Sequence, residues 1–326
     1  MGRAGRAASI LAIVVGVSLI AFPLAYSLFG RTADAERILD RFEFFTLGGS
    51  PLARYLPDAE TTRAGSVQLL DEAIPSLASD AGVSRSEFDR FSQASLPALA
   101  VAREEVPKAN EFSRRYSRQL DAVDEKFQSV YDIPTGDLSL AATAWLFVVG
   151  GVVCLGVGLV ALRTNSRVSV ATILGLGVAI VLGLLVLSAP GKSADGEDVK
   201  DFASRGLTAK AAGAAQRASS ALDALVSETE RRTLPYLARR QGISEAELDQ
   251  KLHRDFPATD KFLAQWDTIG PRLSRLADAV SASVEEFRSV KKVPISPPVW
   301  LLFGGGLAMS LIAGFALIAG RTPEAD

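Results

Sequence analysis

Four long stretches of this chain carry no Asp, Glu, Lys, Arg or His, and they constrain its fold more than any other feature. They cover residues 9–30, 138–162, 168–191 and 297–320. Each is long enough to cross the hydrocarbon core of a bilayer, which takes about 20 helical residues. We therefore predict an all-α, integral membrane protein with four transmembrane helices. The alternative is a soluble protein that buries four apolar helices.

The first stretch could also be a cleaved signal peptide. Arg3 and Arg6 give it a basic start, and Ala25-Tyr26-Ser27 loosely suits a signal peptidase. Its apolar run of about 20 residues exceeds the roughly 7–15 residues that are usual for such a peptide. It also precedes the first long polar segment just as 168–191 precedes the second, so we expect a retained helix.

Arginines mark the short segments at one end of the predicted spans. These are the N-terminus (1–8), the central loop (163–167) and the C-terminus (321–326), and their arginines are Arg3, Arg6, Arg163, Arg167 and Arg321. Positive charge beside short loops favours the cytoplasmic side. We expect both termini and the loop in the cytoplasm of a plasma membrane protein, and the two long segments, 31–137 and 192–296, outside the cytoplasm.

A short stretch occurs twice, 160 residues apart. Besides the terminal Ala98 and Ala258, the stretch Ile74 to Ala98 shares eight residues with Leu234 to Ala258. They are Pro75, Leu77, Ala78, Gly82, Ser84, Glu87, Asp89 and Pro97, which recur as Pro235, Leu237, Ala238, Gly242, Ser244, Glu247, Asp249 and Pro257. Upstream, GRTADAE from Gly30 resembles GKSADGE from Gly191 at an offset of 161. We infer a tandem duplication of a span, a helical ectodomain and a second span, with a first half (9–162) and a second half (168–320).

The repeated stretch predicts a corner between two helices. A glycine suits a left-handed C-cap, the serine two residues later suits an N-cap, and a glutamate three residues on completes a capping box. A proline then breaks or restarts the next helix. These residues are Gly82, Ser84, Glu87 and Pro97 in the first half, and Gly242, Ser244, Glu247 and Pro257 in the second.

Apolar periodicity predicts four helices in each long segment, the third being short. In the first half these are a helix from Ala33 through Phe45, a turn at 48–51, a helix over 58–80, a short helix after Ser84, and a last helix. Its single apolar stripe is Phe112, Tyr116, Leu120, Val123, Phe127 and Val130. In the second half, the first helix covers the alanine-rich run from Lys210 to Leu225, and the last carries Leu273, Leu276, Val280, Val284, Phe287 and Val290.

Small residues recur every four positions in the second and fourth spans. They are Gly150, Cys154 and Gly158, and Gly306, Ser310 and Gly314. This spacing lets helix backbones approach closely. We expect these faces to pack against each other or against another subunit, although glycine is also simply common in membrane spans.

No residue constellation indicates a reaction. His253 is the only histidine and aligns with Gln93, so we expect it at the surface. Cys154 is the only cysteine, and we expect it to pack inside a span. Trp266 aligns with Val106 and is expected in the core. We therefore predict a protein that is not an enzyme, with no catalytic, cofactor or metal site, and the sequence does not indicate the ligand-binding residues.

The corner LARRQGISEAELDQKL resembles the helix-turn-helix of DNA-binding proteins. Its second helices, SRSEFDRF and SEAELDQKL, carry acids where contacts to DNA need Lys or Arg. Segment 31–137 has 13 basic against 19 acidic residues, and segment 192–296 has 17 against 16. Neither has the basic surface that phosphate binding requires, so we expect no nucleic-acid partner.

The plan of the chain resembles the extracytoplasmic four-helix sensor domains of chemoreceptors, which also lie between two spans. Its Ala- and Arg-rich style, with DFPA-type and xIP-type repeat endings, resembles uncharacterised actinobacterial envelope membrane proteins, and this implies no activity. We expect a non-enzymatic envelope protein whose ectodomains bind a protein partner or membrane lipids. The alternatives are a passive channel or lipid conduit and a ligand sensor. The absence of charge inside the spans argues against a pump.

Overall fold

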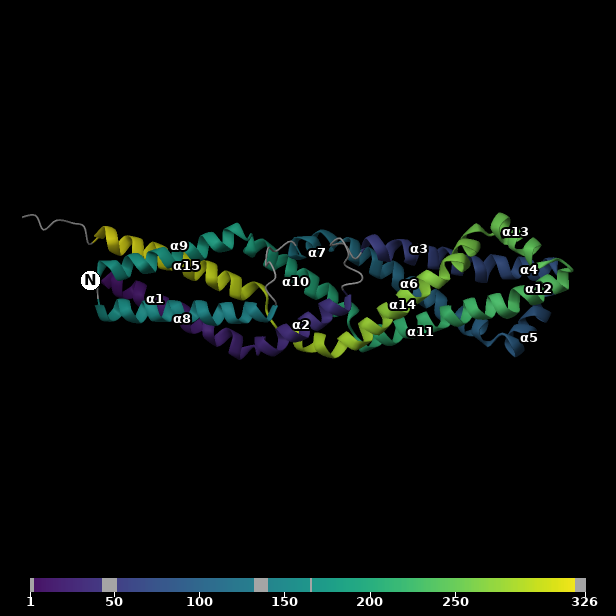
Figure 1. The fold of residues 1–326 in the computed structure, drawn as a ribbon, viewed down its shortest axis with the longest axis horizontal. Helices are drawn as coiled ribbons and strands as arrows, with labels where there is room; N and C mark the ends of the chain where they lie inside the picture. Colours follow the sequence, from purple (N-terminus) through teal and green to yellow (C-terminus); the bar gives the residue numbers. More distant parts are fainter. Residues whose placement is uncertain (1–2, 43–51, 132–139, 165, 320–326) are drawn as a thin grey trace, which may run out of the picture. The chain divides into compact units, whose positions relative to one another are not determined.

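The computed structural model describes residues 3–42, 52–131, 140–164 and 166–319 (Figure 1). These residues form helices joined by short turns, and no strand occurs among them, so the all-α prediction is confirmed. The chain divides into two compact units, each built from both halves. The span unit comprises residues 1–40, 125–204 and 285–326, and the bundle unit comprises residues 41–124 and 205–284.

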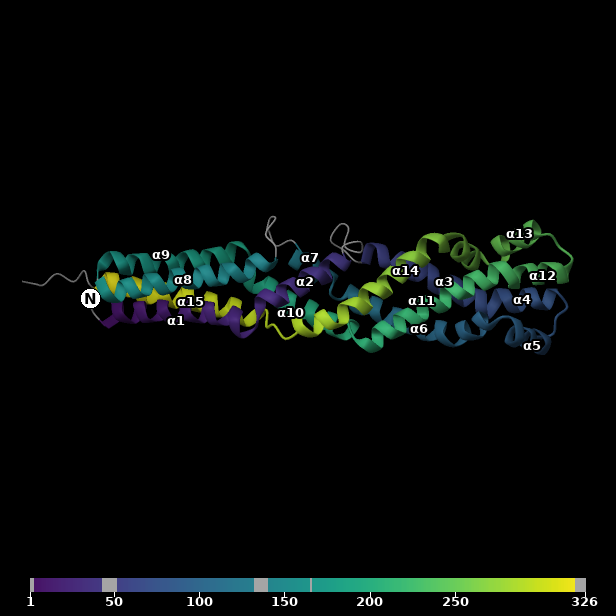
Figure 2. The ribbon, with the colours of Figure 1, turned by 60° about the horizontal axis from the view of Figure 1, so that its bottom comes forward.

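In the described part of the span unit, four apolar helices are long enough to cross a membrane. They are α1 (Arg3–Ala25), α8 (Leu140–Thr164), α9 (Arg167–Val186) and α15 (Ser296–Ala319). Figures 1 and 2 show them running alongside one another. Their shared core consists largely of small and aliphatic side chains, including Ala12, Val15, Cys154, Ile173, Met309 and Ala313. The chain thus carries four helices of the predicted kind, with bounds a few residues from those expected.

Two spans end earlier than their charge patterns predict. The predicted ends lay at residues 30 and 191, next to the first ionisable side chains, but α1 stops at Ala25 and α9 at Val186. Ser27 (φ 50°) and Ser188 (φ 51°) adopt the left-handed conformation just beyond these ends. That conformation cannot continue a right-handed helix. The chain restarts at once as α2 (Leu28–Phe42) and α10 (Ala189–Gly206), which belong mainly to the span unit with most of α7 (Asp124–Tyr131).

Among its described residues, the bundle unit has four longer helices and four short ones. The longer helices are α3 (Leu52–Gln68), α6 (Pro97–Asp121), α11 (Ala209–Glu228) and α14 (Pro257–Val290), whose last residues belong to the span unit. The short helices are α4 (Ile74–Asp80), α5 (Arg85–Ser95), α12 (Leu234–Gln241) and α13 (Glu245–Asp255). Figure 2 shows α4, α5, α12 and α13 gathered at one end of this unit.

One hydrophobic cluster serves both halves of the chain inside the bundle unit. From the first half it contains Leu69, Ile74, Leu77, Phe88, Leu99 and Val106. From the second half it contains Leu225, Leu237, Leu248, Phe262, Trp266 and Ile269. The segments therefore bury their apolar faces in a common core.

The last helix of the first half differs from its prediction. The expected single helix breaks at Ala122 and Val123, between α6 and α7, whereas α14 runs without a break. Leu120, before this turn, and Val123, within it, are buried, but Phe112 is 40% exposed and stacks on Tyr116. The predicted position of Phe45 and the turn at 48–51 lie outside the described residues. The helix predicted over 58–80 begins at Leu52.

A π-helical turn interrupts the helix before each corner. The two turns are η2 (Leu69–Ala73) and η3 (Thr229–Thr233), and Ile74 and Leu234 donate to the carbonyls five residues earlier. Pro75 and Pro235 follow directly. Because proline lacks the N–H that an α-helix needs, a wider turn accommodates it without a break.

The corners themselves form as predicted. Gly82 (φ 66°) and Gly242 (φ 70°) are left-handed, and Ser84 and Ser244 accept hydrogen bonds from the N–H groups three residues on. The full capping box forms at Ser244. At Ser84 the glutamate carboxylate lies 3.4 Å from the serine hydroxyl. Pro97 and Pro257 begin α6 and α14.

Candidate functional site

The residues considered for chemistry each lie in a different local setting. His253 is exposed, and its Nδ1 lies 2.8 Å from Asp260 Oδ2. Cys154 is buried within the span unit as a free thiol. Within the described ranges, no three His, Cys, Asp or Glu residues gather as a metal-binding group would require. Trp266 is buried in the shared core, as expected.

Gln68 and Glu228 each cap a helix from the other half. The Gln68 Oε1 accepts from the N–H groups of Ala258 (2.9 Å) and Thr259 (3.0 Å), at the start of α14. The Glu228 carboxylate accepts from Ala98 (3.1 Å) and Leu99 (2.9 Å), at the start of α6. The first N–H groups of a helix have no partner inside it. Each half therefore completes a helix of the other.

Near the Gln68 cap a small residue lies against a large one, and the positions 160 residues away carry a large and a small residue in the opposite order. A Cβ on Gly65 would lie 2.6 Å from the Ala258 carbonyl and would clash with Phe262, so α3 and α14 approach closely here. The positions 160 residues away are Leu225 and Ala102, both fully buried. The large side chain comes from α14 in one case and from α11 in the other, which preserves volume in the core.

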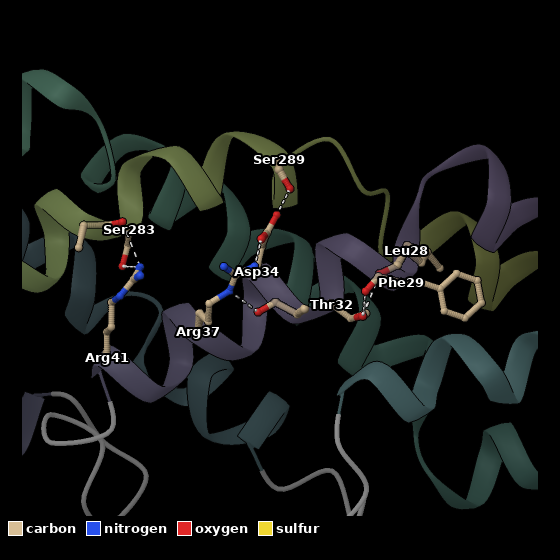
Figure 3. A network of polar contacts seen from close by, with 10 residues as sticks. Leu28, Phe29, Thr32, Asp34, Arg37, Arg41, Ser283 and Ser289 are labelled. Atoms are coloured by element: carbon tan, nitrogen blue, oxygen red, sulfur yellow. Dashed lines mark hydrogen bonds and ion pairs between the residues drawn. The ribbon is translucent and has the colours of Figure 1, made fainter.

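A second pair of reciprocal contacts between the two halves joins helices of the span unit. The Ser289 hydroxyl of α14 donates to Asp34 Oδ2 of α2 at 2.5 Å (Figure 3). The Ser129 hydroxyl of α7 donates to Asp195 Oδ2 of α10 at 2.6 Å. Ser129 and Ser289 are 160 positions apart, and Asp34 and Asp195 are 161 apart. The two bonds therefore join residues at offsets of 160 and 161 positions, close to those of the sequence match between the halves.

Glu197 caps the start of α15 from α10. Its Oε1 accepts from the N–H groups of Ile295 (2.7 Å) and Ser296 (3.3 Å), and Lys200 forms an ion pair with the carboxylate. Burial raises the pKa of Glu197, but the hydrogen bonds from Lys200, Ile295 and Ser296 outweigh it. The net result is a pKa below the usual value for a glutamate, because the charged form is the better acceptor.

Glycines pack the span helices together in pairs. A Cβ on Gly16 would lie 2.6 Å from Leu155 N and 2.7 Å from the Gly151 carbonyl, joining α1 to α8. A Cβ on Gly177 would lie 2.7 Å from the Gly306 carbonyl and 2.6 Å from Ser310 Oγ, joining α9 to α15. Such close approach stabilises helix pairs in membranes.

The predicted small-residue faces contact the first and third spans of the chain. Gly158 packs against Ile13, and Gly306 against Ile180, but a Cβ on Gly150 would meet nothing within 4 Å. Gly16 lies against Gly151 and Gly177 against Gly306, and these two partner residues are 155 positions apart in the sequence. Trp145 and Trp300 are separated by the same 155 positions. The 160-residue offset of the corners therefore does not extend into the second and fourth spans.

An apolar cleft beside Gly150 lies in the span unit. It encloses about 280 Å³, and its lining includes Leu146, Val153 and Cys154 of α8 and Leu176 and Ile180 of α9. The residue 155 positions after Gly150 is Gly305, and a Cβ there would lie 2.8 Å from Val15. Val15 therefore fills the space beside Gly305, whereas the space beside Gly150 is open. The cleft is thus a structural difference between the two halves of the chain.

The bundle unit contains a cavity of mixed polarity, which we call the α3–α6 pocket. It encloses about 270 Å³ and is lined by Val67 of α3, Leu70 and Asp71 of η2, and six residues of α6: Arg103, Val106, Pro107, Asn110, Glu111 and Arg114. Two lining charges have partners outside it. Arg103 pairs with Asp89 at 3.2 Å, and Glu111 pairs with Arg115 at 2.6 Å.

The α3–α6 pocket was not predicted from the sequence. Its only signal is the alignment of Val106 with Trp266, because replacing an indole by an isopropyl group removes volume from the core. Comparison with models of known protein families finds no match, and no curated protein matches the sequence. No known family therefore lends the chain an activity.

Proposed function

We propose that this chain is a non-enzymatic, multi-pass plasma membrane protein whose bundle unit binds a partner protein or membrane lipid as an accessory or scaffold subunit. The observation that carries this proposal is the reciprocal capping by Gln68 and Glu228 above one shared core. Helices that complete one another fold as one body, which offers a partner a preformed surface and lowers the entropic cost of binding.

The same contacts support a tandem duplication of a span, a helical ectodomain and a second span. Both exchanged pairs, Gln68 with Glu228 and Asp34–Ser289 with Asp195–Ser129, obey the offset of the sequence repeat. A duplicated unit that first assembled as a pair of identical chains would make such contacts in equivalent copies. In this proposal the two ectodomains, 31–137 and 192–296, intertwine rather than form separate bundles.

The surface that we assign to the partner is made by α5 and α13, whose outward residues Ser86 and Ala246 are equivalent and exposed. Photo-crosslinking side chains placed at either position in cell membranes should give one adduct of the same mass, absent without light. Glu104, which is exposed on α6, provides the control position. Adducts that are equally frequent at all three positions, or absent from all, would contradict the proposal.

The proposed orientation places both termini and the 163–167 loop in the cytoplasm, supported by the arginines of the short segments. Cys154→Ala supplies a cysteine-free background. Single cysteines at Ser84, Ser244 and Ser166 can then be labelled in intact cells with an impermeant maleimide. Labelling at Ser84 and Ser244 alone supports this orientation. Labelling at Ser166 alone reverses it and revives the helix-turn-helix interpretation.

The cleft beside Gly150 supports a second candidate, a passive lipid conduit. The cleft has a volume of about 280 Å³, and its lining, which includes Leu146, Val153 and Leu176, is apolar, as an acyl chain requires. Gly150→Leu should slow lipid transfer between liposomes if the cleft is the path. Gly156→Leu, which also adds a side chain to open space on α8, is the matched control.

A further inference from the structure

The α3–α6 pocket lies where the second half of the chain buries an indole ring. Trp266 is 160 positions from Val106, and Gly270 is 160 positions from Asn110. Trp266 Nε1 donates to Asp223 of α11 at 3.2 Å, and its ring packs edge-on against Phe262 at 5.1 Å. A Cβ on Gly270 would lie 2.8 Å from the ring. The indole therefore lies over Gly270, between α11 and α14.

The first half has the same helices but lacks the ring. Val106 is 1% exposed, so the position remains in the core, but its side chain is much smaller than an indole. The cavity opens beside Val106 and Asn110, the counterparts of Trp266 and Gly270. Exposed residues such as Val67 and Arg114 also line the pocket, so it is open to solvent. A bound ring would displace water from the apolar wall that Val67, Leu70 and Val106 form, and burying that apolar surface favours binding.

The polar side chains of the α3–α6 pocket define the rest of the molecule. Among the described residues, the buried Asn110 Nδ2 finds no acceptor, although unpaired buried donors are uncommon. Arg114 lies one helical turn further along the same face of α6 and also lines the pocket. A carboxylate would accept from both groups. Asp71 on the opposite wall suits an additional ammonium group.

We propose that the α3–α6 pocket binds a small planar aromatic carboxylate, whose ring takes the place that the Trp266 indole takes in the second half. Asn110 and Arg114 hold the carboxylate, and Leu70 and Val106 pack against the ring. This site is independent of the α5 and α13 surface proposed above. It gives the ligand-sensing alternative a specific location, on helices that belong to the common core.

Isothermal titration calorimetry on the full chain in lipid nanodiscs tests the proposal, with indole-3-acetate as the probe. We expect one molecule bound per chain. Indole, which lacks the carboxylate, should bind at least about tenfold more weakly, and tryptophan measures the effect of adding an ammonium group. No binding of indole-3-acetate at millimolar concentration, or equal binding of indole, would overturn the proposal.

A variant that copies the second half fills the pocket. Val106→Trp with Asn110→Gly should weaken indole-3-acetate binding at least about tenfold. Val101→Trp adds the same side chain at an exposed position on α6 and should leave binding unchanged. Because the double variant could fold poorly, Asn110→Leu provides a second test: it should weaken indole-3-acetate about tenfold and leave indole unaffected. Unchanged indole-3-acetate binding in Asn110→Leu would overturn the assignment of the carboxylate.

Discussion

Gln68 and Glu228 occupy equivalent positions in the two halves, and each caps the first turn of the long helix that follows the corner in the other half. One is an amide and the other a carboxylate, yet each accepts two N–H groups. Both side chains lie next to a helix start where two partly buried backbone N–H groups need a hydrogen-bond acceptor. The negative charge on Glu228 also favours the positive end of the α6 dipole.

Removing the Glu228 cap should destabilise the bundle unit. Glu228→Ala leaves the N–H groups of Ala98 and Leu99 unpaired, at a cost of about 1–2 kcal/mol. Glu228→Gln keeps an acceptor and should lose only a few tenths of a kcal/mol at physiological ionic strength. Thermal unfolding monitored by circular dichroism compares the two. Equal losses for both variants would show that charge, rather than capping, is what Glu228 contributes.

A large side chain at position 65 should be tolerated when the side chain at position 262 is made small. Gly65→Leu alone forces side-chain volume against the backbone of α14, and Phe262→Ala alone leaves a cavity that costs about 3–5 kcal/mol. Together they recreate the Leu225 and Ala102 arrangement of the other half. The double variant should therefore be more stable than the sum of the single losses predicts, by about 1–3 kcal/mol in a double-mutant cycle. Additive losses would count against equivalent packing.

Close packing between α9 and α15 should depend on one glycine. Gly177→Leu places a side chain against the Gly306 carbonyl and Ser310, and we expect a loss of about 1–3 kcal/mol or more. Gly175→Leu, two residues away on the same helix, meets nothing within 4 Å and should change stability by about 0.5 kcal/mol or less. Melting temperatures in detergent distinguish the two. A similar response to both substitutions would contradict the helix pairing.

Acid should release the link between α10 and α15. The pKa of Glu197 in the folded state lies below its ordinary value of 4.5. Its carboxylate therefore contributes stability at pH values above that ordinary value. The contribution declines as the pH falls and is lost once the pH passes below the folded-state pKa. Glu197→Gln should be less stable than the parent at pH 7, with the difference vanishing in acid.

Chemical denaturation of the parent and Glu197→Gln across pH 3–7 measures this loss. Asp249→Asn, at an exposed position on α13, is the control and should remain close to the parent at each pH. A difference between parent and Glu197→Gln that grows in acid would reverse the sign and refute the assignment.

Local chemistry made the corners predictable. Gly82 and Ser84 act through their own backbone and nearest neighbours, so their left-handed and capping conformations follow from residue type. The charge-free stretches likewise predicted four apolar helices, because a bilayer excludes charge whatever the tertiary contacts are. Other features were less visible. Two spans end near Ser27 and Ser188, although no charged residue marks these positions. The only sequence signal for the π turns is the proline that follows each of them, Pro75 or Pro235.

The sequence by itself determined that the chain is helical, that four of its helices suit a membrane, and where its corners turn. Only the tertiary structure decided which helices complete one another. The sequence does not show that Gln68 accepts hydrogen bonds from Ala258 and Thr259. A side-chain amide can cap any helix start that lies near it, and tertiary packing brings this helix, 190 residues further along the chain, next to Gln68. The α3–α6 pocket likewise exists only once α6 is packed, since an empty space belongs to no single residue.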